Sequence, residues 1–158
     1  MEKTEILKDI VLFKDLTTFE IIKVNKVTKT RNLKSDEVIF REGTTGDSLY
    51  IVKSGSVRVT KLDEGGEEKV LAILNPGDHF GEIALVDNHP RSATVIANED
   101  SELIQIQAED FNKLLENDKE IALKFYKSFL KVLCMRLRDT NESLTFSRSL
   151  LESMDKER

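Results

Sequence analysis

The sequence predicts a mainly β fold with flanking helices (α+β), in the form of a β-roll or double-stranded jelly roll followed by one long C-terminal helix. All seven glycines lie between Gly43 and Gly81, and the two prolines are Pro76 and Pro90, so turn-forming residues are concentrated in the middle of the chain. Within that middle, short β-branched runs alternate with turns, which is typical of compact all-β units. Both ends instead have helical periodicity, and neither glycine nor proline follows Pro90.

The predicted elements follow in order along the chain. Two short helical patterns, ILKDIVLFKDL and FEIIKVNKV, precede the first strand. Strands are expected where apolar residues cluster or alternate with polar ones, as Val57 and Val59 alternate with Arg58. About eight short strands suit such a roll. The clearest runs are VIF from Val38, LYIVKSGSVRVT from Leu49, VLAILNPGD from Val70, SATVIA from Ser92 and ELIQIQ from Glu102.

The rest of the chain is predicted to be helical, with a short helix, AEDFNKLLEND, and then one uninterrupted helix from Lys119 to about Met154. That helix would be roughly 50 Å long, more than one face of a small domain. Part of it has the alternating three- and four-residue spacing of a coiled-coil seam. The seam residues are Leu133, Leu137, Thr140, Leu144, Ser147, Leu151 and Met154. We expect residues 1–118 to form the β-roll together with its N-terminal helices and the short helix after it, and residues 119–158 to form a long helix that makes a homodimer. The alternative is a helix that lies along its own domain.

Composition indicates one soluble, cytoplasmic domain. A chain of 158 residues can bury a core without covalent crosslinks, and the single cysteine, Cys134, cannot pair within the chain. No apolar run approaches the roughly 18 residues of a membrane span, and the start, MEKTEILKDI, lacks the apolar core of a signal peptide. The formal net charge of −5 argues against a nucleic-acid-binding surface over the whole domain.

One short segment, FGEIALVDNHPRSATV at residues 80–95, carries a carboxylate and a guanidinium in apolar surroundings. Glu82 and Arg91 must each find a partner there, either one another or a ligand, because an isolated charge in an apolar setting is costly. A tight turn at Gly81 and a helix start would present backbone N–H groups to an anion, beside the charge of Arg91 and the hydroxyl of Ser92. Glu82 would repel phosphate but accept from a sugar hydroxyl. One ligand containing both groups fits the segment.

The segment resembles the phosphate-binding cassette of the cyclic-nucleotide-binding domain family, which includes catabolite activators, protein kinase A regulatory subunits and cyclic-nucleotide-gated channels. The match is F-G-E-(I/L)-A-L, a short loop, and then P-R-(A/S/T)-A-(T/S)-V, all in order. Upstream, VIFREGTTGDSLYIVKSGSVRV resembles the family's earlier strands, with glycines at Gly43, Gly46 and Gly55. The resemblance covers about residues 6–145.

The resemblance implies a set of ligand-binding residues. They are Gly81, Glu82, Ile83, Ala84, Arg91, Ser92, Val59, Leu71, Thr140 and Asn141. By similarity, Glu82 takes the ribose hydroxyl, and Arg91 and Ser92 hold the cyclic phosphate. Backbone N–H groups around Ile83 and Ala84 complete the anion site.

The resemblance also implies contacts to the base. Val59 and Leu71 stand where the family lines its pocket with apolar side chains. Thr140 stands where catabolite activators place a helix residue against the adenine amino group, and Asn141 would reach the base from the partner chain, so the long helix would form a lid over the base. Thr140 favours cyclic AMP over cyclic GMP, although Ser92 suits either nucleotide.

The implied protein is a non-catalytic receptor without a cofactor, in which cyclic nucleotide binding rearranges the C-terminal helix and regulates an unidentified protein partner. A catabolite activator continues into a helix-turn-helix, for which too few residues follow Leu144, so we expect no direct DNA binding. One alternative is a degenerate family member that acts as a structural dimer or senses another effector. Another is a cupin-like metal enzyme, but His79 and His89, both expected in loops, are the only histidines and too few for a typical three-ligand site.

Overall fold

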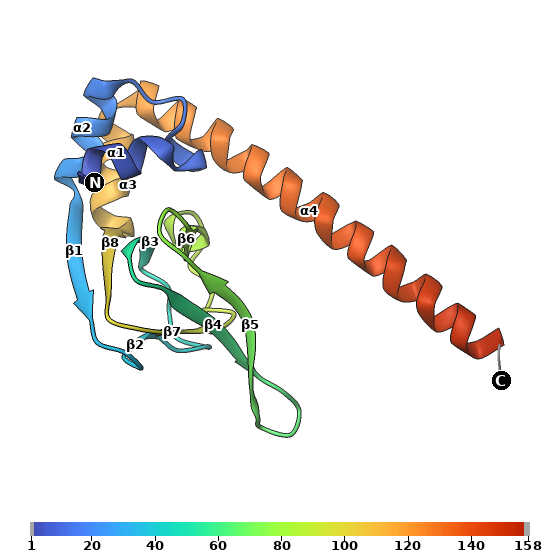
Figure 1. Ribbon diagram of the computed structural model, residues 1–158. Coiled ribbons are helices and arrows are strands. Elements are labelled where there is room, and N and C mark those ends of the chain that lie inside the picture. The colour runs from blue at the N-terminus through green and yellow to red at the C-terminus, as the bar shows by residue number, and fades with distance from the viewer. Residues whose placement is uncertain (1, 157–158) are drawn as a thin grey trace.

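Two antiparallel sheets form a β-roll in the computed structural model, which describes residues 2–156 (Figure 1). One sheet has the strand order β1-β8-β3-β6 and the other has the order β2-β7-β4-β5. The strands are β1 (Thr28–Leu33), β2 (Val38–Phe40), β3 (Ser48–Ser54), β4 (Val57–Leu62), β5 (Glu68–Leu74), β6 (His79–Phe80), β7 (Thr94–Ala97) and β8 (Ser101–Gln107). The predicted mainly β fold with flanking helices is confirmed.

Most of the helices gather at one end of the roll (Figure 1). The helices of residues 2–156 are α1 (Lys3–Asp9), the 3-10 helix η1 (Val11–Phe13), α2 (Thr18–Lys26), the 3-10 helix η2 (Glu82–Leu85), α3 (Ala108–Asn117) and α4 (Lys119–Lys156). The first helix is shorter than the sequence pattern predicts, because the backbone of Ile10 is extended and separates α1 from η1.

The sequence patterns missed two strands. β1 has the polar sequence TKTRNL and lies at the edge of its sheet, where it pairs with β8. It therefore lacks the apolar alternation that would reveal a strand. β6 has two residues, His79 and Phe80, which pair with Ile51 and Tyr50 of β3. His79, which we expected in a loop, is a strand residue.

Strand β3 is buried on both faces and contributes to two hydrophobic cores. Leu49 and Ile51 pack with the helices, while Tyr50 and Val52 pack between the two sheets. This follows from the alternation of side chains along a strand, so the run SLYIVKS serves both cores. The first turns of α4 complete the core on the helical side. Their contributing residues are Ile121, Phe125, Phe129 and Val132.

A buried carboxylate, Glu20, ties α2 to the start of α4. Glu20 is 9% exposed and accepts hydrogen bonds from Lys124 Nζ, at 2.9 and 3.0 Å, and from the backbone N–H of Thr17 at 2.6 Å. Burial by itself raises the pKa of Glu20, but the hydrogen bonds from Lys124 and Thr17 together outweigh burial and hold this pKa below its usual value. The ionised form of Glu20 therefore stabilises the contact between the N-terminal helices and α4.

Glu20→Gln is expected to lower the free energy of unfolding by about 1–3 kcal/mol at pH 7. A carboxyl group with a depressed pKa contributes stability above its unfolded pKa, near 4.3, and loses it as the pH falls through the folded pKa. The difference between wild type and variant should therefore shrink below about pH 4. Urea unfolding at pH 7 and below about pH 4 measures the difference in the free energy of unfolding, with Glu64→Gln, at an exposed glutamate, as the control. An equal difference at the two pH values would contradict a stabilising role for the ionised Glu20.

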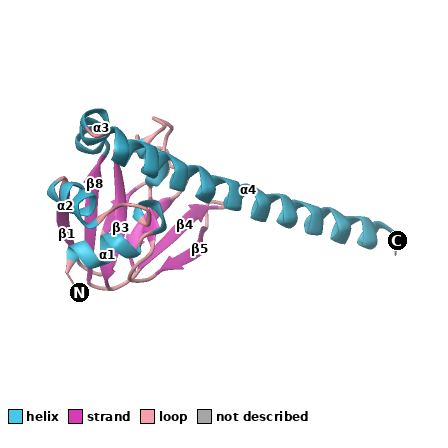
Figure 2. Ribbon diagram, turned by 90° about the horizontal axis from the view of Figure 1, so that it is seen from above, coloured by secondary structure: helices cyan, strands magenta, loops and turns pink. Residues whose placement is uncertain are grey.

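Helix α4 continues far beyond the domain against which it packs (Figure 2). It has 38 residues, or roughly 57 Å, and its last buried residue is Val132. Every residue at 134–156 is exposed. The seam predicted from Leu133 onward extends upstream with the same spacing through Leu123, Tyr126 and Leu130, all exposed. Among the described residues, no helix combines the length and the apolar character needed to cross a membrane.

Candidate functional site

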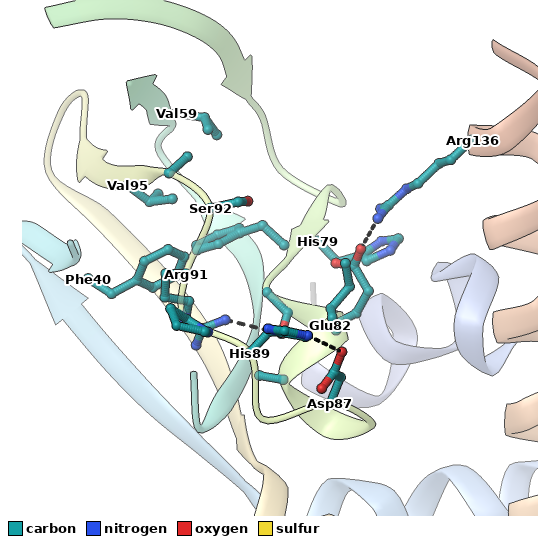
Figure 3. A pocket seen from close by; sticks show the side chains of 16 residues that line it. Phe40, Val59, His79, Glu82, Asp87, His89, Arg91, Ser92, Val95 and Arg136 are labelled. Atoms are coloured by element: carbon teal, nitrogen blue, oxygen red, sulfur yellow. Dashed lines mark hydrogen bonds and ion pairs between the residues drawn. The ribbon is translucent and has the colours of Figure 1, made fainter. Parts of the chain in front are cut away.

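A cavity of about 520 Å³ lies where β6, η2 and the loop before β7 meet β4 and α4 (Figure 3). Its volume is within the range of sites for small molecules. The lining residues are Phe40, Val59, His79, Phe80, Gly81, Glu82, Ile83, Ala84, Asp87, His89, Pro90, Arg91, Ser92, Ala93, Val95 and Arg136. All the predicted ligand-binding residues except Leu71, Thr140 and Asn141 are among them.

The cassette, residues 80–95, begins with a turn that requires glycine. Gly81 has φ of 77°, in the left-handed region. A Cβ atom at this position would lie 2.6 Å from Nη1 of Arg91 and 2.9 Å from the carbonyl oxygen of Ser48. The η2 helix begins directly afterwards, so this turn places Glu82 on the cavity wall while leaving room for the Arg91 guanidinium.

Arg91 is a buried cation that forms no ion pair with a carboxylate among residues 2–156. It is 8% exposed, and its Nη2 and Nη1 donate to the carbonyl oxygens of Ser48 at 2.8 Å and Gly81 at 3.3 Å. Its guanidinium carbon lies 4.0 Å from the centre of the Phe40 ring, and among the described residues Nε has no hydrogen-bond partner. Burial lowers the pKa of Arg91, but an arginine remains protonated in proteins. The cavity therefore presents a positive charge suited to an anion.

Backbone hydrogen bonds hold the loop around Arg91. The N–H of Gly43 donates to the carbonyl oxygen of Arg91 at 2.8 Å, and the N–H of Arg91 donates to that of Thr44 at 2.7 Å. The neighbouring residues Thr45 and Pro90 form a β-bridge. The loop REGTTGDS, which lies far from the cassette in sequence, thus fixes the position from which Arg91 enters the cavity.

Glu82 pairs with Arg136 of α4 and not with Arg91. Glu82 is 3% exposed, and Nη1 of Arg136 donates to its Oε1 (Figure 3). Arg136 lies one turn beyond Val132, and its side chain is 46% exposed. Of the two possibilities left open by the sequence, mutual pairing of the cassette charges is therefore not observed. Glu82 instead links the cassette to the point where α4 leaves the domain.

The sequence reasoning missed Arg136. It lies 54 positions from Glu82, and the fold brings the two together. One signal was present, because Arg136 precedes Thr140 by four residues and so shares its side of a helix. A basic residue one turn from an implied ligand contact was a candidate for the same site.

His79 lies beside the Glu82 and Arg136 pair (Figure 3). Its Nε2 is buried and lacks a hydrogen-bond partner among the described residues. Burial lowers the pKa of His79 and outweighs Glu82, which raises it, and the positive charge of Arg136 lowers it further. The ring is therefore neutral near pH 7. The cavity's other histidine, His89, is exposed, with its Nε2 3.7 Å from Oδ2 of Asp87.

The other predicted ligand-binding residues on the cavity wall differ in their exposure. Ile83 and Ser92 are exposed, and Val59 of β4 lines the cavity wall. Ala84 is buried, and its backbone N–H already donates to the carbonyl oxygen of Gly81 at 3.1 Å. That N–H is engaged within the turn in this structure, so the anion site implied by the resemblance would first need it to be released.

Three predicted ligand residues lie outside the cavity wall. Leu71 is 60% exposed and falls at a register shift in β5, where Val59 pairs with Ala72 and the next pair skips Leu71. The residues on either side, Val70 and Ala72, are exposed as well, so both faces of this edge strand lie outside the core at this point. Thr140 and Asn141 are exposed on the projecting part of α4. Their contacts with a ligand stay predictions that require α4 to move or a second chain to contribute.

The geometry gives no support to a cupin-like metal site. Within residues 2–156, no group of three or more His, Cys, Asp or Glu side chains is placed to hold a metal ion. The cavity's histidines also differ in environment, since His79 is largely buried on a strand and His89 is exposed in a loop.

Comparison with known proteins identifies the family. The sequence profile described as the cyclic nucleotide-binding domain matches residues 30–118. The chain belongs to the cyclic nucleotide-binding domain family. This member is 34% identical to the cyclic AMP receptor protein of Thermus thermophilus over 138 residues, which are 87% of this chain and 62% of the relative. It is 35% identical to a cGMP-dependent protein kinase of Drosophila melanogaster over 127 residues, which are 78% of this chain and 14% of the relative.

A solved structure has the same architecture. The N-terminal domain of a transcriptional regulator from Streptomyces coelicolor A3(2) superposes with a TM-score of 0.77 at 28% identity, covering 88% of this chain and 94% of that domain. This member of the family therefore corresponds to a part of its longer relatives, because it spans less than two thirds of the Thermus protein and a smaller share of the kinase.

Proposed function

We propose that this chain is a non-catalytic cyclic nucleotide receptor that prefers cyclic AMP to cyclic GMP. The observation that supports it most is the pair of buried, opposite charges on the wall of one cavity. A cyclic phosphate would bind Arg91 and the hydroxyl of Ser92, and a ribose hydroxyl would donate to Glu82. The cassette sequence alone suits both nucleotides. The proposed preference for cyclic AMP is supported by Thr140 and by the similarity to the cyclic AMP receptor protein of Thermus thermophilus.

The proposed output depends on α4. Its seam, from Leu123 to Met154, is exposed except at Leu133, which packs partly against the helical core, and it would pair with the same seam of a second chain to form a homodimer. Arg136 connects that helix to Glu82, which is the acceptor proposed for the ribose. A nucleotide would change the position of α4 only by as much as its affinities for the two positions differ. A change in α4 would then regulate a protein partner in the cytoplasm.

Titration calorimetry with cyclic AMP, cyclic GMP and linear AMP tests the proposal. Cyclic AMP should bind most tightly, and linear AMP should bind weakly because its phosphate is not tethered to the ribose in the same geometry. Absence of binding by both cyclic nucleotides would overturn the proposal and favour the degenerate alternative, a structural dimer. Tighter binding of cyclic GMP would overturn the preference alone.

Thr140→Ala is expected to weaken cyclic AMP binding by about 1 kcal/mol, roughly fivefold, through loss of one hydrogen bond to the base. The matched control is Thr145→Ala. Thr145 donates to the carbonyl oxygen of Asn141 at 2.9 Å, as Thr140 does to that of Arg136 at 2.8 Å. Calorimetry with both nucleotides on both variants measures the effect. A ratio of affinities unchanged by Thr140→Ala would argue against the base contact.

A further inference from the structure

Among the described residues, Arg136 is the only one whose side chain forms a hydrogen bond or an ion pair with Glu82. This pair connects the cassette with the projecting half of α4. A carboxylate as buried as Glu82 cannot lose its partner without cost, because an uncompensated buried charge is strongly destabilising. Any movement of α4 that removes Arg136 therefore requires another group to compensate Glu82.

His79 is the group placed to do so. It lies beside both members of the pair (Figure 3), and its Nε2 is buried and without a hydrogen-bond partner among residues 2–156. The charged groups that face it are Asp78, Glu82 and Arg136, and its cross-strand neighbour on β3, Ile51, carries no charge. A protonated imidazole has donors on both nitrogens. Its Nε2–H would then have an acceptor close by in Glu82.

We propose that His79 is a proton-dependent substitute for Arg136: a proton taken up from solvent lets the imidazolium pair with Glu82 and releases α4 from the cassette. The two cations compete for one buried carboxylate, so the uptake of a proton by His79 and the departure of Arg136 favour each other. The proposal deepens the proposed function, on which it rests only for the role of Glu82 toward a ligand hydroxyl. It makes the position of α4 sensitive to pH as well as to nucleotide.

The direction of the pH dependence follows from the same contacts. While Arg136 is in place, burial and the neighbouring cation hold the pKa of His79 below its usual value. Departure of Arg136 removes the repulsion and leaves the attraction of Glu82, so the pKa of His79 should then rise. By linkage, acidification through this range favours the state with α4 released. At neutral pH and above, the Glu82 pair with Arg136 should hold.

Nuclear magnetic resonance titration of the nucleotide-free protein from pH 8 to pH 5 tests the proposal. Arg136→Met should raise the midpoint of the His79 ring by about one pH unit or more. In wild type, the amide signals of α4 around Arg136 should titrate with the midpoint of His79. His79→Gln should abolish that response, and the matched control His89→Gln, at the exposed histidine of the same cavity, should preserve it.

Two results would overturn the proposal: an unchanged His79 midpoint in Arg136→Met, or a response of α4 that persists in His79→Gln. If Arg136→Met does not fold because Glu82 is left uncompensated, the Glu82→Gln variant provides the reciprocal test. Removing the carboxylate should lower the His79 midpoint, and an unchanged or higher midpoint would overturn the proposal. Because these titrations contain no nucleotide, a failure of cyclic nucleotide binding would contradict the proposed function and leave this result standing.

Discussion

Arg91→Ala is expected to weaken cyclic nucleotide binding by about two to three and a half decades. The guanidinium of Arg91 is a buried full charge whose hydrogen bonds go to backbone carbonyl oxygens and whose Nε has no partner among the described residues. Without it, a phosphate entering the cavity would be buried with no counter-charge, at a cost of about 3–5 kcal/mol. Calorimetry with cyclic AMP measures the loss.

Two further variants separate this effect from a general loss of charge or of fold. Arg41→Ala removes an arginine that is exposed and outside the cavity wall, and it should bind normally. Arg91→Lys keeps the charge but loses the planar fork, so it should have intermediate affinity. Thermal unfolding without nucleotide checks the fold, because Arg91 also bonds the carbonyl oxygen of Ser48. Near-normal affinity in folded Arg91→Ala would exclude Arg91 from the site.

The double substitution Leu137→Glu with Leu144→Glu is expected to abolish the proposed dimer. Both leucines are exposed in the single chain and lie on the seam of α4. Burial of a leucine stabilises by about 1.5–3 kcal/mol, and a dimer would contain four such side chains. Their loss, with the added repulsion between carboxylates, should raise the dissociation constant by at least about four decades. Sedimentation equilibrium measures the change.

Phe146→Glu provides the matched control for the dimer. Phe146 is also exposed and apolar, and it lies on the same projecting part of α4, but it is outside the seam. It should therefore leave the dimer intact. A monomeric wild-type protein would contradict the proposed dimer, and loss of the dimer in Phe146→Glu alone would place the interface on another face of the helix.

The cassette was recognisable from the sequence because its parts are close together along the chain. The turn at Gly81, the carboxylate of Glu82 and the guanidinium of Arg91 lie within eleven consecutive residues, and all three line the cavity. The long helix was equally accessible, since neither glycine nor proline interrupts the chain after Pro90 and α4 begins at Lys119 as predicted. Both features depend on local chemistry and spacing.

Other features depend on the pairing of distant strands, which the local sequence does not reveal. The polar strand β1 is a strand because β8 provides its hydrogen bonds, and β6 exists because it pairs with β3. Leu71 lies outside the cavity wall because β5 is an edge strand whose residues 68–73 are all exposed. A pattern of apolar residues predicts a strand, but it does not predict which strand lies at the edge of a sheet with both faces exposed.

The sequence by itself determined that this protein has a β-roll, a long helix with an apolar seam, and a cassette with one carboxylate and one guanidinium. The tertiary structure alone decided how those charges are satisfied: Glu82 by Arg136 of α4, Arg91 by backbone carbonyl oxygens, and His79 at the contact between cassette and helix. The physical reason is that burial makes every charge require a partner, while the choice of partner depends on which distant segments the fold brings together.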